Sequence, residues 1–134
     1  MILLDTSFVV AYYNTRDEHH EKAKEIMQKL KVNMLGECCI TDYIFDECMT
    51  VILLRLKDIK KATEIGNDLL ALTKIIYMDE NLFQFTRQIF KEQQKTKLSF
   101  TDCSSIALLK DRNMQGIVTF DTEFGKVGRI NIIN

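Results

Sequence analysis

The chain has 134 residues, which is enough for one domain with a sizeable core. Hydrophobic residues make up 46% of it and charged residues 28%, the proportions of a soluble globular protein rather than a fibrous or disordered one. The net charge of −1 argues against a chain that is basic throughout and binds nucleic acid by charge alone. No apolar run is long enough to cross a membrane, and we expect no signal peptide and a cytoplasmic location.

The four cysteines lie within apolar segments and lack the paired spacing of a zinc site. We expect them to be reduced and to pack as small hydrophobic residues, as in a reducing cytosol. The chain contains no proline, few glycines and no repeat, so no linker is visible. Residues 1–134 are therefore expected to form a single domain.

The first seven residues predict a buried strand that ends at a functional edge. Ile2, Leu3 and Leu4 form an unbroken apolar run, which is typical of a strand buried on both faces of a parallel sheet. Asp5 follows directly, and a short buried helix is expected to begin near Thr6. Ligands bind beyond the carboxyl ends of strands in such sheets, so Asp5 would stand at a candidate site.

The next segment predicts an amphipathic helix and a second strand. Residues 15–18 have the form of a capping box, and apolar residues at 23, 26, 27 and 30 follow at helical spacing. His19 and His20 would lie in the first turn, where adjacent side chains diverge, so we expect solvent-exposed histidines rather than metal ligands. Residues 35–41 contain a short apolar run that predicts the second strand.

A helix capped by Thr41 or Asp42 is expected to follow, and it carries two acids in its first half. The helix is apolar on nearly all sides and should be largely buried. A carboxylate at Asp46 or Glu47 would then need a partner, because an isolated buried charge is very unfavourable. The pattern leaves open whether one or both acids simply face solvent.

The middle of the chain predicts two further helices and a third strand. A helix capped by Asp58 is expected to run through Lys74, with an apolar stripe at 59, 62, 65, 69 and 72. A strand is expected over 73–78, and Asp79 would cap the next helix. A polar connection over 93–97 would end that helix.

Two segments near the carboxyl end repeat the pairing of an acid with a buried element. Ser99 or Thr101 can cap a helix through Leu109, and this helix has Asp102 in its first turn. Residues 116–120 predict a buried strand that is followed by Asp121. Gly125 and Gly128 mark a turn, and residues 130–133 predict a last strand.

Alternating strands and helices predict an α/β fold with a mostly parallel sheet. Asp5 and Asp121 would then lie at one end of the sheet, and the first turns that carry Glu47 and Asp102 would begin near it. Clustered carboxylates repel one another, and a hard divalent cation such as Mg²⁺ removes that conflict. One or two ions could activate water against a phosphodiester. Four hydroxyl groups could orient carboxylates or phosphate: Thr6, Ser7, Thr101 and Thr119.

The combination of these segments resembles the PIN domains, in particular the VapC-type toxin ribonucleases, over essentially the whole chain. The resemblance rests on residues 3–7, on Asp46–Glu47 within an apolar helix, on 98–102 and on 118–124. It implies a Rossmann-like sheet flanked by helices, Mg²⁺ or Mn²⁺, and hydrolysis of RNA. The implied catalytic and metal-binding residues are Asp5, Glu47, Asp102 and Asp121, with Thr6 and Thr119 at the hydroxyl positions of the family. Glu47 fits the phase of the family better than Asp46, and Glu123 is a candidate additional acid.

The resemblance also implies partners, and it leaves alternatives open. A standalone PIN domain of this length looks like a toxin that pairs with an antitoxin and forms a homodimer. Neutralising four of the 19 acids would leave the 18 basic residues in slight excess, which permits RNA binding. Candidate RNA contacts are Arg55, Lys57, Lys97, Arg112 and Lys126. The alternatives are an RNA-processing PIN nuclease without an antitoxin, a non-catalytic RNA-binding or partner-binding module, and a phosphotransfer domain, which Ser7 disfavours.

Overall fold

The computed structural model describes residues 1–32 and 36–134, and a five-stranded sheet lies at its centre. The strand order is β3-β2-β1-β4-β5, and each neighbouring pair is parallel. The predicted α/β class with a mostly parallel sheet is therefore confirmed. The strands are β1 (Ile2–Leu4), β2 (Cys38–Thr41), β3 (Lys74–Ile76), β4 (Gly116–Val118) and β5 (Ile132–Ile133).

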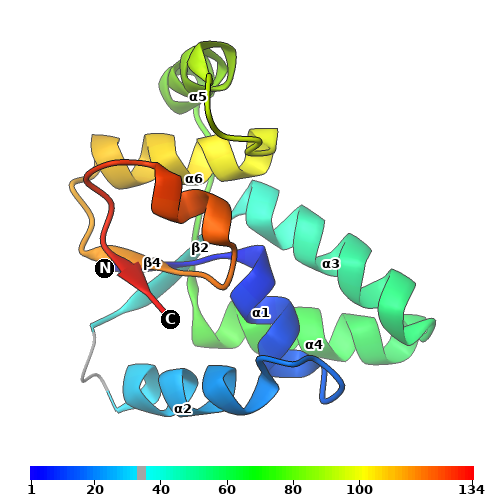
Figure 1. Ribbon diagram of the computed structural model, residues 1–134. Helices are drawn as coiled ribbons and strands as arrows, with labels where there is room; N and C mark the ends of the chain where they lie inside the picture. The colour runs from blue at the N-terminus through cyan, green and yellow to red at the C-terminus, as the bar shows by residue number, and fades with distance from the viewer. Residues whose placement is uncertain (33–35) are drawn as a thin grey trace.

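Helices cover both faces of this sheet (Figure 1). Helices α5 and α6 pack together on one face, whereas α1, α2, α3 and α4 lie on the other. A short 3-10 helix, η1, follows β4. The bounds are α1 (Thr6–Tyr13), α2 (His20–Lys31), α3 (Asp42–Leu56), α4 (Ile59–Leu72), α5 (Glu80–Glu92), α6 (Phe100–Asp111) and η1 (Thr122–Lys126).

The central strand β1 explains where a site can form. Its three residues are at most 2% exposed, as expected for a strand covered on both faces. Leu3 pairs with Cys39 of β2 on one side and with Ile117 of β4 on the other. The chain leaves β1 towards β2 and returns on the opposite side at β4, so the strand order reverses there. A crevice is expected beyond the carboxyl ends of β1 and β4.

The start of the second helix differs from the prediction of a capping box at Thr15. Helix α2 begins at His20, and its N-cap, His19, makes no side-chain capping bond. The preceding residues form a turn instead: the Asp17 carboxylate accepts the His19 N–H at 3.0 Å and lies 3.3 Å from the Arg55 guanidinium. These contacts of Asp17 fix the turn, so the prediction of a capping box that begins at Thr15 was wrong.

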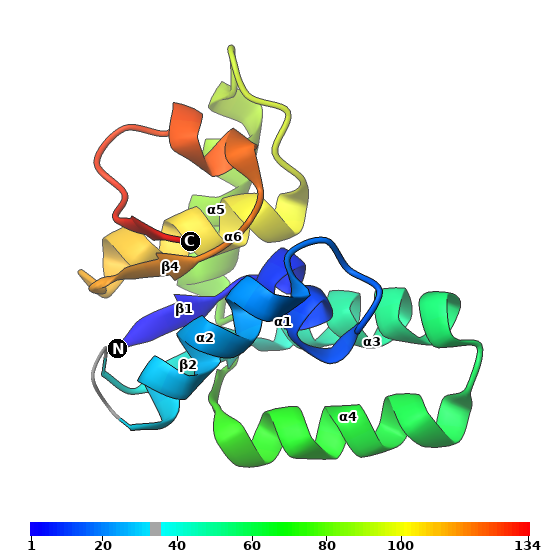
Figure 2. The same cartoon turned by 60° about the horizontal axis from the view of Figure 1, so that its bottom comes forward.

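Helix α3 is less buried than its composition predicted. Three of its residues, Ile44, Cys48 and Ile52, are buried, whereas Leu54 is 70% exposed. The cause is visible in Figure 2, where α3 and α4 form an antiparallel pair that projects beyond the sheet. The part of α3 farthest from the sheet therefore has no layer above it.

The remaining differences are small. The predicted strand over 35–41 begins at Leu35, which lies outside the described residues, and β2 starts at Cys38. Helix α4 ends at Leu72 rather than near Lys74, because Lys74 belongs to β3. All four cysteines are free, as predicted, and three of them are buried. In the described part of the chain, no helix has the length and apolar character that a membrane span requires.

Candidate active site

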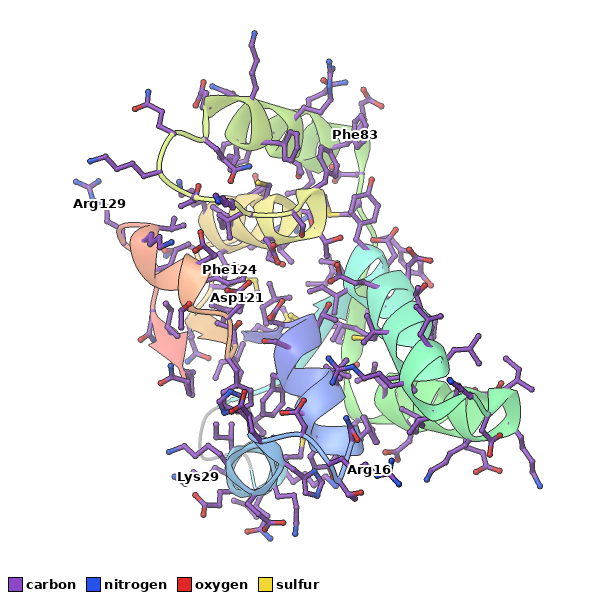
Figure 3. The ribbon with its side chains drawn as sticks, turned by 45° about the vertical axis from the view of Figure 1, so that its right-hand side comes forward. Arg16, Lys29, Phe83, Asp121, Phe124 and Arg129 are labelled. Atoms are coloured by element: carbon purple, nitrogen blue, oxygen red, sulfur yellow. The ribbon has the colours of Figure 1, made fainter. Side chains whose placement is uncertain are left out.

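A pocket of about 450 Å³ opens beyond the carboxyl ends of β1 and β4, and six carboxylates line it, two of which, Asp17 and Glu18, come from the turn before α2. In Figure 3, the labelled Asp121 lies between α6 and α1. These two helices form two walls of the pocket. Helix α3 and the turn before α2 complete the enclosure. The structure thus brings together the four acids singled out from the sequence: Asp5, Glu47, Asp102 and Asp121.

Asp5 is the most buried of the four, with 2% of its surface exposed. It is the N-cap of α1, and its Oδ2 atom accepts the Ser7 N–H at 3.2 Å. The same oxygen accepts the hydroxyls of Ser7 at 2.6 Å and Thr119 at 2.8 Å. The pKa of Asp5 is raised to about 6, chiefly by burial and to a smaller extent by the Asp102 charge, against the lowering by the hydroxyls of Ser7 and Thr119.

Asp102 is held by a capping box at the start of α6. Its Oδ2 accepts the Ser99 N–H at 2.7 Å, and the Ser99 hydroxyl accepts the Asp102 N–H at 3.1 Å. Burial raises the pKa of Asp102, and the charge of Asp121 adds to the effect, against the lowering by Ser99. The acids of the pocket therefore repel one another through a partly desolvated space.

Asp121 is fixed by a local capping bond, whereas Glu47 is fixed by a hydroxyl from another helix. Asp121 is the N-cap of η1, where its Oδ1 accepts the Glu123 N–H at 2.8 Å. Glu47 lies in the second turn of α3, rather than in the predicted first turn, and its Oε2 accepts the Thr6 hydroxyl at 2.5 Å. Each of the four carboxylates thus has one oxygen held by the protein.

The second oxygen of each carboxylate is free to bind a ligand. No hydrogen bond to it occurs among the described residues, and no side-chain oxygen there is both buried and unpaired. These four oxygens therefore keep some exposed surface, and the residues that carry them line the pocket. An all-oxygen set of donors suits Mg²⁺ or Mn²⁺ rather than zinc or copper.

The spacing of the acids favours an ion that keeps much of its water. Within residues 1–32 and 36–134, no three His, Cys, Asp or Glu side chains are close enough to hold one ion directly. Mg²⁺ is commonly held by one or two carboxylates and several waters, so this spacing is compatible with it. The residues present fit a hydrated divalent ion and do not form a closed cage.

Other residues named from the sequence lie elsewhere. Asp46 is exposed and does not line the pocket, in contrast to Glu47. Glu123 accepts the Lys97 N–H at 3.0 Å and pairs with the Lys126 ammonium, so both its oxygens are engaged outside the pocket. Thr101 makes no side-chain bond to a carboxylate in the described part of the chain; Ser99 does.

Of the five basic candidates for RNA contact, Arg55 lines the pocket, where it pairs with Asp17. The others are absent from the residues that line it. Sequence reasoning also missed two aromatic rings of the wall, His19 and Phe120. Phe120 could have been predicted to line the pocket, because it lies between Thr119 and Asp121, which were both placed at the site. No local sequence pattern places His19 at the pocket.

Replacing Ser7 by alanine is expected to weaken divalent-ion binding by about 10- to 100-fold. The substitution removes a hydroxyl that donates to Asp5 and accepts the Phe120 N–H at 3.0 Å, so the Asp5 carboxylate loses both charge stabilisation and orientation. Calorimetric titration with Mn²⁺ measures the effect. Ser105→Ala is the matched control, because its hydroxyl bonds to a backbone carbonyl. Equal affinities in the two variants would contradict the role of Ser7.

Comparisons with known proteins agree with this fold. The sequence model of the family described as "PIN domain" matches residues 2–130. A VapC ribonuclease of Archaeoglobus fulgidus is 24% identical over 123 residues, which cover 91% of this chain and 78% of that protein.

Solved structures show the same fold at low identity. The VapC20 toxin of Mycobacterium tuberculosis, described as cleaving the sarcin-ricin loop, superposes with a TM-score of 0.84 at 21% identity. That likeness covers 96% of this chain and 95% of that one. A chain of the DNA-bound VapBC complex of Salmonella typhimurium gives 0.75 at 18% identity, over 98% and 96% of the two chains.

Proposed function

The chain belongs to the PIN-domain family, and from this premise we propose that it is a Mg²⁺- or Mn²⁺-dependent endoribonuclease. The observation that carries the proposal is the pocket in which four carboxylates each present one free oxygen. The likeness to a VapC ribonuclease over most of the chain supports RNA as the substrate.

The metal-binding residues of this proposal are Asp5, Glu47, Asp102 and Asp121. Divalent ions bound there supply an activated water and charge stabilisation at the phosphate and the leaving oxygen. The protein fixes the carboxylates beforehand: Ser7 and Thr119 hold Asp5, and Ser99 holds Asp102. Because these donors already occupy one oxygen of each carboxylate, the free oxygens need little reorganisation to bind an ion.

We further propose that the protein is the toxin of a toxin–antitoxin pair, acts in the cytoplasm and forms a homodimer. The similarity to a chain of the VapBC complex of Salmonella typhimurium and to a toxin–antitoxin complex of Klebsiella pneumoniae supports a partner protein. A cognate antitoxin would suppress cleavage when added in equimolar amount, and size-exclusion chromatography with light scattering would test the dimer.

Cleavage of a total RNA pool is the direct test of the proposed activity. We expect RNA cleavage in Mg²⁺ or Mn²⁺ that disappears with a chelator. The cleavage rate should fall by at least about 100-fold in Asp102→Asn, because the substitution removes a carboxylate oxygen that would bind the metal. Asp46→Asn, prepared identically, is the matched control, because Asp46 is exposed outside the pocket. Equal cleavage by wild type and Asp102→Asn would reveal a contaminating nuclease. RNA binding without cleavage by wild type would favour the non-catalytic module.

A further inference from the structure

Three aromatic rings form a column that runs from the core to the pocket. Phe8 is fully buried, and its ring centroid lies 6.0 Å from that of Phe120. The His19 imidazole stacks on Phe120 with centroids 4.5 Å apart and planes inclined by 14°. The side chain of His19 is 45% exposed, so the column ends in a flat ring that solvent can reach.

The backbone around this column is tied to the acidic pocket. The Phe120 N–H donates to the Ser7 hydroxyl at 3.0 Å, and that hydroxyl donates to Asp5. On the other side, the His19 N–H donates to Asp17, which pairs with Arg55 of α3. Two of the three rings, His19 and Phe120, line the pocket together with the four candidate metal-binding carboxylates. The column is therefore a rigid wall beside the candidate metal site.

Nothing in the proposed hydrolysis uses this wall. The imidazole makes no hydrogen bond to the four candidate metal-binding carboxylates among the described residues; its Nε2 lies 3.7 Å from Glu18, a further carboxylate of the pocket lining, at the edge of the ring. An edge contact leaves a ring face available for stacking. A parallel histidine–phenylalanine pair with one outer ring exposed is a platform to which a further flat ring can be added.

We propose that His19, supported by Phe120, stacks on a nucleobase of the RNA next to the phosphate that is cut. The inference rests on the proposed function, since the carboxylates fix where that phosphate lies. Proteins hold unstacked bases of single-stranded RNA on aromatic rings, histidine included. Such stacking tolerates any base, and its loss weakens binding by about 5- to 100-fold. His19 is thus a substrate-binding residue that sets which nucleotide is held open beside the cut.

Binding of short fluorescent RNAs tests the stack directly. The probes are single-stranded hexaribonucleotides that carry 2-aminopurine at each position in turn, whose fluorescence falls when the base stacks on a ring. Asp102→Asn protein in Mg²⁺ serves as the common background, so that RNA is not cut during titration. We expect quenching at one position, together with a loss of about 5- to 100-fold in affinity when His19→Ala is added.

Two further substitutions separate stacking from other roles. His19→Phe keeps a flat ring without nitrogen atoms and is expected to retain both quenching and affinity. His20→Gln is the matched control, because His20 does not line the pocket and bonds to the Ala11 carbonyl, which glutamine can also do. Thermal melting of each variant checks folding, and His19→Phe keeps the test decisive if His19→Ala unfolds.

The outcomes distinguish this inference from the proposed function. In the cleavage-competent protein, His19→Ala should raise KM with little change in kcat, since a stacked base is bound equally in ground state and transition state. RNA cleavage by wild type with an unchanged KM and affinity in His19→Ala would overturn the stack alone. Hexamer binding that depends on His19, without metal-dependent cleavage, would overturn the nuclease alone. A His19→Phe protein as weak as His19→Ala would also overturn stacking.

Discussion

Replacing Asp5 by asparagine is expected to stabilise the metal-free protein at pH 7.5 by up to about 3 kcal/mol. Burial raises the pKa of this carboxyl from 3.8 to about 6, so its ionised form is unfavourable in the folded state. Asparagine carries no charge and can still accept the hydroxyls of Ser7 and Thr119 through its Oδ1 atom. A substitution that should abolish metal-dependent activity should therefore raise the free energy of unfolding.

The size of this effect depends on pH. Because the pKa of Asp5 is higher in the folded than in the unfolded chain, the folded state binds the proton more tightly. The stabilisation from that proton is complete below about pH 4 and is lost as the pH rises through about 6. The difference between Asp5→Asn and wild type should therefore be small near pH 4 and largest above pH 7.

Urea unfolding at pH 4, 6 and 7.5 in the presence of a chelator measures the difference. Asp46→Asn is the control, because this exposed carboxylate lies outside the pocket and its removal leaves the surroundings of Asp5 unchanged. Added Mg²⁺ should raise the Tm of wild type at pH 7.5 and leave Asp5→Asn nearly unchanged, since binding stabilises by mass action. An Asp5→Asn protein that is less stable than wild type at pH 7.5 would refute the account.

Glu47→Gln is expected to lower RNA cleavage by at least about 100-fold, whereas Asp46→Asn should change it less than about twofold. The two acids are adjacent on α3, yet Glu47 lines the pocket and accepts the Thr6 hydroxyl, while Asp46 is exposed. Glutamine keeps the size of the side chain and an acceptor for Thr6. The loss would therefore report the missing negative charge at the metal site rather than a packing defect.

Initial rates over a range of Mn²⁺ concentrations show whether the loss of cleavage in Glu47→Gln comes from weaker metal binding. If Glu47 binds the metal, Glu47→Gln should need more Mn²⁺ for half-maximal rate, while the curve for Asp46→Asn should match wild type. The reverse ranking of the two variants would mean that the pocket of the active protein uses the neighbouring acid. If neither Glu47→Gln nor Asp46→Asn changed the cleavage rate, no acid of α3 would take part in catalysis.

The sequence by itself determined the features that depend on neighbours in the chain. The apolar run of β1 before Asp5 and that of β4 before Asp121 each predicted a buried strand with an acid at its end. Ser99 and Asp102, three residues apart, form their capping box within one turn of α6. Such contacts need no other element, because local backbone geometry brings residues two or three positions apart into reach.

Only the tertiary structure decided which side chains meet across elements. Thr119 reaches Asp5 from 114 positions away, and Thr6 selects Glu47 over Asp46 from 41 positions away. An apolar pattern restricts which face of a helix is buried, but the rotation and height of that helix against its neighbours come from packing of the whole core.

The same reason explains the two largest surprises. The stack of His19 on Phe120 joins the turn before α2 to the end of β4, and no local signal in either segment refers to the other. The apolar composition of α3 predicts a buried helix, yet its pairing with α4 beyond the sheet leaves Leu54 exposed. Burial is a property of the layers that surround an element, so composition sets only its tendency and the assembled fold sets the outcome.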